Sequence, residues 1–207
     1  MNCAEIVSFV KDAILGCVAI AGVYVANKGL NTWKHQLKGQ SEYELSRRTL
    51  ITIFKYRDAI AGVRHPLMLA SEMPIPPLDE AKKMTRDELQ FYGTSKAYQT
   101  RWDRVRVVRT TLDADVIEGE VIWGDEIKTL FRTLFNLENE LFTSIRLYLE
   151  LIDPEKSEDR KNAISEIYKK RRDILYDDYS DEGDGYKNDF QNGVDAIARF
   201  LKPKLQY

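Results

Sequence analysis

Apolar residues recur at helical spacing along most of this chain, but the first apolar stretch lacks that periodicity. Ala13 to Ala26 carries no charge and covers about 21 Å as a helix, short of a hydrocarbon core of roughly 30 Å. Starting at Ile6 extends the span to about 31 Å, at the cost of including Lys11 and Asp12. A stretch that is apolar all round predicts a transmembrane helix, and thus an N-terminal membrane-anchor domain over residues 1–27.

Two other interpretations of this stretch stay open. A cleaved signal peptide needs basic residues before its apolar core, yet residues 1–5 contain none and no strong cleavage site follows. The other is a soluble helical bundle whose first helix belongs to the core, because runs of about 10–14 apolar residues are often core helices. We favour the anchor because the residues that follow are typical of a membrane interface.

Residues 28–40 form a basic flank beside the apolar stretch. Lys28, Lys34 and Lys38 lie in it, and Trp33 is suited to headgroup depth. Positive residues stay on the cytoplasmic side, so the flank predicts a single-pass protein of the bacterial inner membrane, with its N-terminus outside and its C-terminal domain cytoplasmic. The lysines are also suited to anionic lipid, and the alternative for them is a solvated linker.

The remaining domain, residues 41–207, has the periodicity of several amphipathic helices. Ser41 to Glu44 has the pattern of a capping box and predicts a helix from there to Arg64, before a His-Pro pair. A loop with four prolines follows, and a second capping box at Thr85 to Glu88 predicts the start of a long helix. The apolar stripe of that helix comprises Phe91, Tyr98, Trp102, Val105, Leu112 and Val116.

The next helix has the clearest periodicity, and Gly119 and Gly124 separate it from the one before. Its apolar arc comprises Ile127, Leu130, Phe131, Leu134, Leu137, Leu141, Phe142, Ile145, Tyr148 and Ile152. We expect a charged helix from about Glu155 to Tyr176, and then a short final helix marked by Phe190, Val194, Ile197 and Leu201. The predicted fold class is therefore all-α, with an N-terminal transmembrane helix followed by a four- to five-helix bundle.

Composition narrows the classes of function. The chain has 207 residues, of which 43% are hydrophobic and 31% charged, which is ordinary globular usage. With a net charge of −2, the chain lacks the overall positive electrostatic potential that attracts nucleic acid. Cys3 and Cys17 are the only cysteines and both lie in the apolar stretch, so the sequence predicts no disulfide framework for the folded part.

Basic and aromatic residues alternate in KAYQTRWDRVRVVR, residues 96–109, a pattern that also occurs in RNA-binding segments. On a helical wheel Tyr98 and Trp102 share the apolar stripe, while the basic residues scatter over most of the circumference. These basic residues are Lys96, Arg101, Arg104, Arg106 and Arg109. We therefore expect core aromatics beside a solvated charged face, and no nucleic-acid partner.

Catalytic motifs do not occur in the sequence. Its two histidines are His35, in the basic flank, and His65, directly before a proline, so neither is well placed as a base. Nucleophilic triads and zinc sites need more than this, and neither of the glycine-rich phosphate loops is present. We therefore expect no enzyme and no cofactor, with a metal-dependent hydrolase that uses carboxylates alone as an alternative.

An acidic stretch, residues 177–189, precedes the final helix. Aligned as a calcium loop it offers Asp178, Ser180, Glu182 and Asp189 as ligands. Glu182 is an unusual ligand at its place in such a loop, and Asp189 is too short for easy bidentate binding. A flexible acidic linker without a metal is the favoured interpretation.

The string TWKHQLKGQSEYELSRRTL, followed by FKYRDAI and VRHP, resembles a recurring pattern in uncharacterised bacterial proteins with one N-terminal span. The resemblance covers roughly residues 30–66, and it implies a membrane-associated helical protein without a known activity. The leading hypothesis is thus a non-enzymatic, membrane-tethered module that binds a protein partner or forms a homo-oligomer. The soluble bundle and the carboxylate-only hydrolase are the alternatives.

Overall fold

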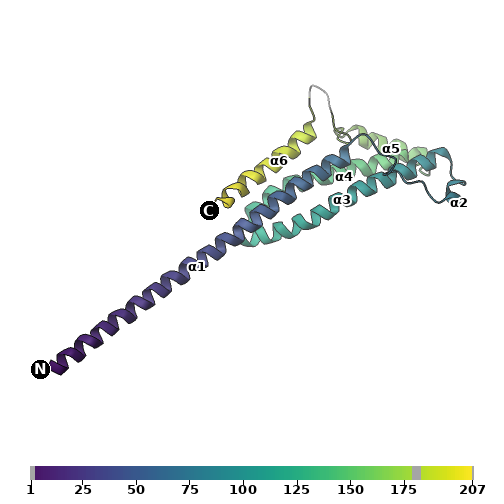
Figure 1. Ribbon diagram of the computed structural model, residues 1–207. Coiled ribbons are helices and arrows are strands. Elements are labelled where there is room, and N and C mark those ends of the chain that lie inside the picture. The colour runs from purple at the N-terminus through teal and green to yellow at the C-terminus, as the bar shows by residue number, and fades with distance from the viewer. Residues whose placement is uncertain (1–2, 179–182, 207) are drawn as a thin grey trace. The chain divides into compact units, whose positions relative to one another are not determined.

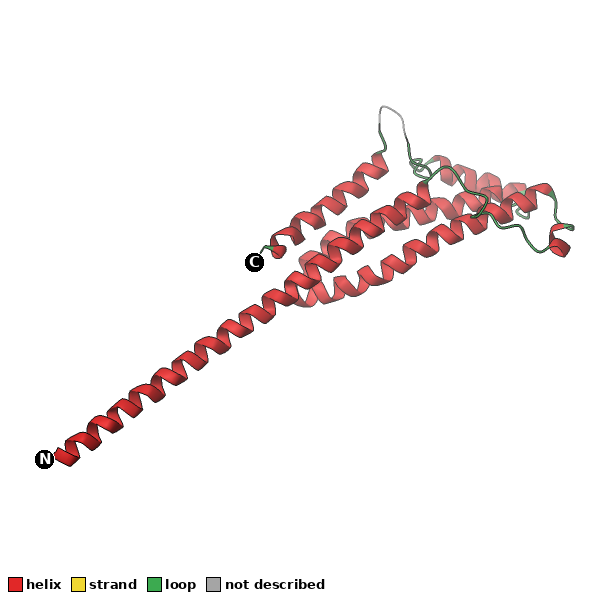
Figure 2. Ribbon diagram, in the orientation of Figure 1, coloured by secondary structure: helices red, strands yellow, loops and turns green. Residues whose placement is uncertain are grey.

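A computed structural model describes residues 3–178 and 183–206, except for the side chains of residues 3–14, 17, 19 and 20. Over this part the chain is helical and has no strand (Figures 1 and 2), which confirms the all-α prediction. The helices are α1 Cys3–Arg64, α2 Leu78–Ala81, α3 Arg86–Trp123, α4 Asp125–Ile152, α5 Glu158–Lys169 and α6 Gly185–Leu201, followed by the short 3-10 helix η1 Lys202–Leu205.

α1 is one continuous helix that passes through the predicted start at Ser41. That prediction is wrong, because Ser41 and Glu44 both lie inside the helix. The side-chain amide of Gln40 donates a hydrogen bond to the Glu44 carboxylate, one turn further on, at 3.0 Å. Serine and glutamate are tolerated within helices, so their spacing alone does not mark a helix start. The predicted end at Arg64 is confirmed.

The predicted membrane anchor is wrong. Within the described residues, no helix combines the length and the apolar character that crossing a bilayer requires. The proposed span Ile6–Ala26 begins on side chains outside the described residues, and its charge-free part, Ala13 to Ala26, is too short for a hydrocarbon core. The predicted single-pass topology and inner-membrane location depended on this span, so they are wrong as well. The helical-bundle alternative describes the chain better.

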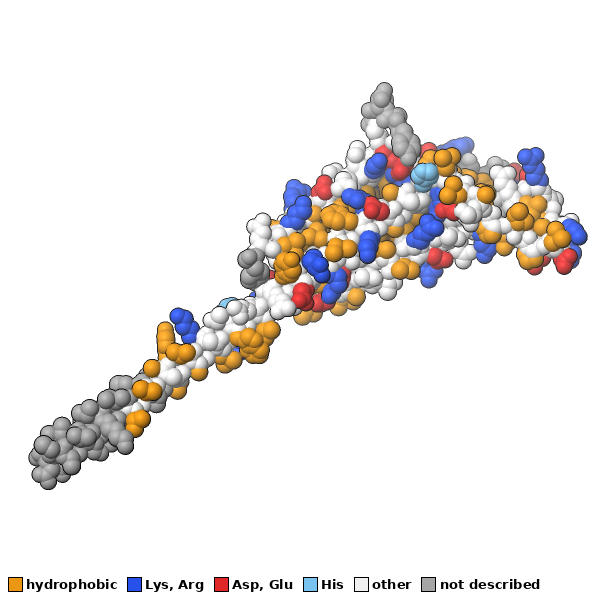
Figure 3. Space-filling model, viewed as in Figure 1, with side chains coloured by type: hydrophobic (Ala, Val, Ile, Leu, Met, Phe, Trp, Pro, Cys, Tyr) orange, Lys and Arg blue, Asp and Glu red, His pale blue; other side chains and the backbone are white. Residues whose placement is uncertain are grey.

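Two compact units divide the chain, Met1–Glu44 and Leu45–Gln206. The described part of the first unit belongs to α1, so the predicted basic flank, with Lys28, Lys34 and Lys38, is helical and not an irregular linker. The large apolar side chains of this unit are exposed (Figure 3): Leu15, Val18, Val23, Tyr24, Val25, Leu30, Trp33 and Leu37.

The second unit is a bundle in which α4 packs against α3, α5 and α6 (Figure 1). The C-terminal part of α1 belongs to the same core, whereas the described apolar side chains of residues 15–26, which the alternative placed in a core, are exposed. The buried side chains of that C-terminal part are Leu50, Ile53, Tyr56, Ile60 and Val63. The sequence pattern of the long helices therefore identified the elements that form the core.

The apolar stripes predicted for α3 and α4 largely form the core. In α3, Phe91 and Trp102 are only half-buried, whereas the other four predicted residues are buried. In α4, Phe142 is 44% exposed, while the core residues include Ile127, Phe131, Leu134, Leu141 and Ile145. Gly124 separates the two helices with a φ of 79°, a left-handed conformation that favours glycine.

α5 is shorter than the charged helix predicted from Glu155 to Tyr176. It begins after Ser157, whose hydroxyl oxygen accepts a hydrogen bond from the Arg160 backbone N–H at 3.4 Å. It ends at Lys169, and irregular backbone then buries Ile174 and Leu175. The final helix α6 is confirmed, and it begins at Gly185, so part of the predicted acidic linker is helical.

Arg101 corrects the prediction of a solvated charged face on α3, because only 4% of this residue is exposed. Its guanidinium donates to the carbonyl oxygens of His65 and Leu67, each at 2.6 Å, and to both carboxylate oxygens of Glu72. Arg101 therefore satisfies carbonyl groups just beyond the end of α1 and holds the proline-rich loop. Hydrogen bonds from this guanidinium also keep the pKa of Glu72 below its usual value.

Candidate functional site

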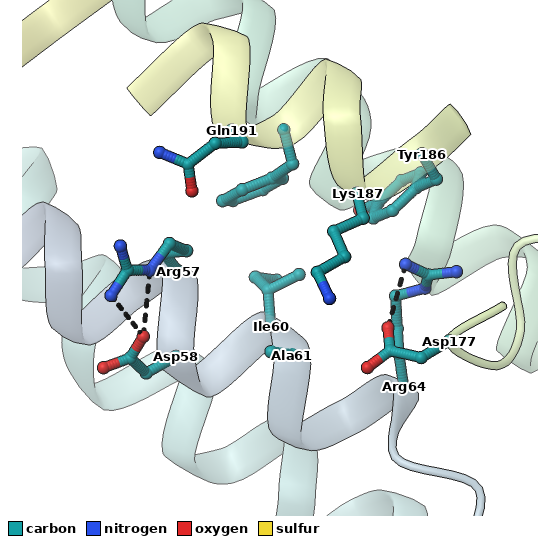
Figure 4. Close-up of a pocket in the computed structure, with 10 residues that line it drawn as sticks. Arg57, Asp58, Ile60, Ala61, Arg64, Asp177, Tyr186, Lys187 and Gln191 are labelled. Carbon is teal, nitrogen blue, oxygen red and sulfur yellow. Dashed lines mark hydrogen bonds and ion pairs between the residues drawn. The ribbon is translucent and has the colours of Figure 1, made fainter. Parts of the chain in front are cut away.

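A cavity of about 340 Å³ lies between α1 and α6 in the bundle unit (Figure 4). Its size is at the low end of small-molecule sites in proteins, which run from roughly 300 to 1,000 Å³. One face of α1, one face of α6 and the loop before α6 line it. The lining residues are Arg57, Asp58, Ile60, Ala61, Arg64, Asp177, Tyr186, Lys187, Phe190 and Gln191.

Apolar side chains from both helices line one part of this cavity. Ile60 of α1 is 2% exposed, and Tyr186 and Phe190 of α6 are 2% and 3% exposed. The Phe190 ring also packs against Tyr56 of α1, with 5.5 Å between ring centroids. These rings are fixed by the packing of the core, so the apolar wall exists before a ligand binds.

Arg64, the last residue of α1, is the most strongly held charged group of the site. Only 2% of it is exposed, and it forms ion pairs with Asp177 at 3.1 Å and Asp184 at 2.8 Å. It also donates to the carbonyl oxygens of Ile174 at 2.7 Å and Tyr176 at 2.6 Å. These partners compensate the buried charge, so Arg64 fastens the loop before α6 to the end of α1.

Asp184 connects this ion pair to the start of α6. As the N-cap of the helix, its carboxylate accepts a hydrogen bond from the Lys187 backbone N–H at 2.9 Å. Its other oxygen accepts from the Asp178 backbone N–H at 3.0 Å. Burial on its own raises the pKa of Asp184, but these hydrogen bonds and Arg64 together outweigh burial and hold that pKa below its usual value.

The rim of the cavity carries two cations, Arg57 and Lys187, of which only Arg57 has a partner among the described residues. Arg57 donates from Nε and Nη2 to the Asp58 carboxylate at 2.9 and 2.8 Å. The Lys187 side chain points into the space between Ile60 and Asp177 (Figure 4). Within residues 3–178 and 183–206, its ammonium group has no hydrogen bond or ion pair. Lys187 is therefore the wall cation for which the described residues supply no partner.

A partly buried polar triad, formed by Tyr56, Glu138 and Arg109, lies next to the α1 side of this cavity. The Tyr56 hydroxyl donates to the Glu138 carboxylate of α4, which also accepts from Arg109 Nε of α3 at 2.9 Å. Burial raises the pKa of Tyr56, and the negative charge of Glu138 raises it further. The phenol thus stays protonated at neutral pH and acts as a hydrogen-bond donor that links three helices.

The calcium candidate is only partly within the described residues. Ser180 and Glu182 lie outside them. The Asp189 carboxylate accepts a hydrogen bond from Arg172 at 2.7 Å, and Arg172 also pairs with Glu140. Asp178 donates its backbone N–H to Asp184. Among residues whose positions are described, no group of three or more histidine, cysteine or acidic side chains is arranged to hold a metal ion.

The other predicted candidates are not among the residues that line this cavity. Lys28, Trp33, Lys34 and Lys38 all belong to the first unit, where Lys38 makes a long ion pair of 3.9 Å with Glu42. His35 is exposed on the same segment of α1. In the bundle unit, the ring of His65 accepts a hydrogen bond from the Leu67 backbone N–H at 3.3 Å, which gives it a role in the turn after α1.

Sequence reasoning missed Arg64 and Lys187 as site residues. Arg64 directly follows the buried Val63 and precedes the residues that end α1, and a charge at that position gives only a weak sequence signal. Lys187 is one of many surface lysines by sequence. The tertiary contact between α1 and α6 brings the two residues together, and that contact cannot be read from the periodicity of either helix.

Comparisons with known proteins identify no relative. The chain matches no protein-family model, and neither curated proteins nor solved structures include a match. The resemblance of residues 30–66 to bacterial proteins with one N-terminal span therefore stays a prediction.

Proposed function

We propose that this protein is a non-enzymatic binding protein, and that its α1–α6 cavity takes a small molecule with a carboxylate beside an apolar tail. The Lys187 ammonium, which lacks a partner among the described residues and points into a cavity with an apolar wall, carries this proposal. A carboxylate would pair with Lys187 through charge-assisted hydrogen bonds. The tail would lie against Ile60 and Phe190, where burying apolar surface is favourable.

Charge on the cavity wall favours an anion over a cation. The two carboxylates that line it, Asp58 and Asp177, are each paired with an arginine, at 2.8 and 3.1 Å. Those pairs leave Lys187 as the wall charge without a described partner. An anionic ligand gains this interaction, whereas a cationic one would face the like charge of the Lys187 ammonium.

Binding without catalysis is the other part of the proposal. Neither histidine of the chain lines the cavity, so no imidazole is positioned there as a general base. The two carboxylates on the wall, Asp58 and Asp177, are already engaged in ion pairs with Arg57 and Arg64. These groups suit recognition of a ligand better than transfer of a proton.

Calorimetric titration of the full chain with octanoate and octanamide tests this proposal. The two probes share their tail and differ in charge, so we expect octanoate to bind at least about tenfold more tightly, a difference of roughly 1.4 kcal/mol. Lys187→Met should abolish this preference. Lys202→Met removes a lysine just after the same helix but outside the cavity, and should leave it intact. Equal binding of both probes to the unmodified protein would refute the proposal.

A further inference from the structure

A second surface belongs to the first unit and shares no residue with the cavity lining. On α1 the apolar side chains of Val23, Ala26, Leu30, Trp33 and Leu37 follow one another at intervals of three and four residues. Val23 is 71%, Leu30 48%, Trp33 57% and Leu37 47% exposed. We call these five residues the α1 seam. Their alternating spacing is the heptad repeat with which helices pair in coiled coils.

The α1 seam has a polar side opposite it. In the same heptad register, Lys28, His35 and Glu42 repeat every seven residues on the side of the helix farthest from the seam. Tyr24 and Val25, just before Lys28, are exposed apolar residues on this same side, whereas Asn31, Thr32 and Lys38 after it are polar. From Lys28 onward α1 is therefore amphipathic, and a partner helix would cover its apolar side while the polar side stays in solvent.

We propose that a second copy of this chain covers the α1 seam, with the two α1 helices paired in parallel and in register. A helix with the same repeat can cover such a seam, and a second copy of this chain supplies one. In-register pairing places Lys34 opposite Gly29 of the other copy, and Ser41 opposite Gln36. Like charges therefore do not meet along the seam, and the glycine leaves room for the lysine stem.

The surface available is sufficient for a weak, reversible dimer. The exposed fractions of the seam side chains correspond to on the order of 400–500 Å² per copy, so the pair would bury roughly 1,000 Å², the lower limit for a specific interface. Mass action then predicts an association that depends on protein concentration. The proposal is independent of the ligand proposed for the cavity.

Sedimentation equilibrium of the full chain tests this pairing over roughly 1 to 200 µM, the range in which weak dimers dissociate. We expect the average mass to rise from the 24.0 kDa monomer toward twice that value. Leu30→Glu places two like charges in the seam and should raise the dissociation constant at least about tenfold. Lys28→Glu, on the opposite side, should leave it within about twofold. A protein that stays monomeric, or equal effects of the two variants, would overturn the proposal.

Disulfide cross-linking distinguishes a parallel pair from other assemblies. In a Cys3→Ser, Cys17→Ser background, Leu30→Cys should form a covalent dimer rapidly on oxidation, because equivalent seam positions face each other in register. Lys28→Cys should not. Efficient cross-linking at position 28, or none at position 30 in a protein that sediments as a dimer, would contradict the parallel register.

Discussion

The two parts of α1 have similar apolar content but different surroundings. Between Leu45 and Arg64, Ile53, Tyr56 and Val63 are completely buried in the bundle core. Between Leu15 and Leu37, the large apolar side chains whose positions are described are about half exposed or more. Hydrophobicity therefore shows where a helix has an apolar face but does not show what covers that face. In the bundle part the cover is the chain itself, and for the α1 seam we propose a second copy.

Among substitutions that compare the two parts of α1, Arg64→Met should cause the largest loss of unfolding free energy. Removing the guanidinium leaves Asp177 and Asp184 buried beside a neutral side chain, which costs about 3–5 kcal/mol of unfolding free energy. Lys34→Met in the first part should leave that free energy unchanged within error. Chemical denaturation followed by circular dichroism measures both. A loss under about 1 kcal/mol for Arg64→Met would mean that its ion pairs do not hold the bundle together.

Truncation of one apolar side chain in each part compares their packing directly. Ile53 is fully buried, so Ile53→Ala removes contacts and leaves a cavity, which costs about 2–4 kcal/mol. Leu30→Ala should change the unfolding free energy by less than about 0.5 kcal/mol at concentrations where the protein is monomeric. Chemical denaturation of both variants, followed by circular dichroism, measures the two losses of unfolding free energy. Comparable losses for the two variants would show that the first part of α1 is also packed in the monomer.

A pair of tyrosine variants sharpens the comparison for polar contacts. Tyr56→Phe removes the hydroxyl that donates to Glu138 and should cost about 1.5–3 kcal/mol, as expected for a hydrogen bond to a charged group. Tyr24→Phe, in the first part, alters a side chain that is 67% exposed and should have no measurable effect. If Tyr56→Phe proves neutral, the triad does not contribute to linking α1 to α3 and α4.

Two aspartates of the bundle unit should make the unfolding free energy depend on pH, and their contributions should change in opposite directions as the pH falls. We expect both contributions to be smaller than the effects of the substitutions above. The pKa of Asp184 lies below its ordinary value of 3.8, so its contribution is complete above that value and is lost as the pH falls through the folded pKa. Asp115 of α3 is 2% exposed and accepts a hydrogen bond from Arg48 Nε of α1 at 2.7 Å. Burial raises the pKa of Asp115, although Arg48 opposes this, so its contribution grows as the pH falls through the raised pKa.

Asparagine variants of both residues allow this sign difference to be measured. In denaturation curves from about pH 7 to 3, the stability advantage of the unmodified protein over Asp184→Asn should shrink as the pH falls. Its advantage over Asp115→Asn should change in the opposite direction. Parallel pH profiles for the two variants would be inconsistent with the contacts described for these carboxylates.

Much of the bundle could be predicted from the sequence, because its helices have one apolar face and recognisable ends. The Thr85–Glu88 capping box is present as predicted, with the Glu88 N–H donating to the Thr85 hydroxyl at 3.3 Å. The same pattern at Ser41–Glu44 failed, because α1 continues through it. Local spacing thus predicts a helix face reliably but does not predict how far a helix extends.

The candidate site was beyond sequence reasoning for a different reason. Arg64 is buried because its partners come from residues 174–184, more than a hundred positions away, and Arg101 is buried because it binds the loop after α1. On a helical wheel both arginines resemble solvated charges. Only the tertiary structure shows that both arginines hold loops near the end of α1, and that Arg64 also lines the cavity.

Nuclear magnetic resonance of the octanoate complex tests the central claim, that the α1–α6 cavity binds an apolar carboxylate, most directly. We predict nuclear Overhauser contacts from the octanoate chain to the Ile60 methyl groups and the Phe190 ring, together with a shift of the Lys187 Nζ resonance. Octanoate contacts confined to other residues, with the Lys187 resonance unchanged at saturation, would contradict the account.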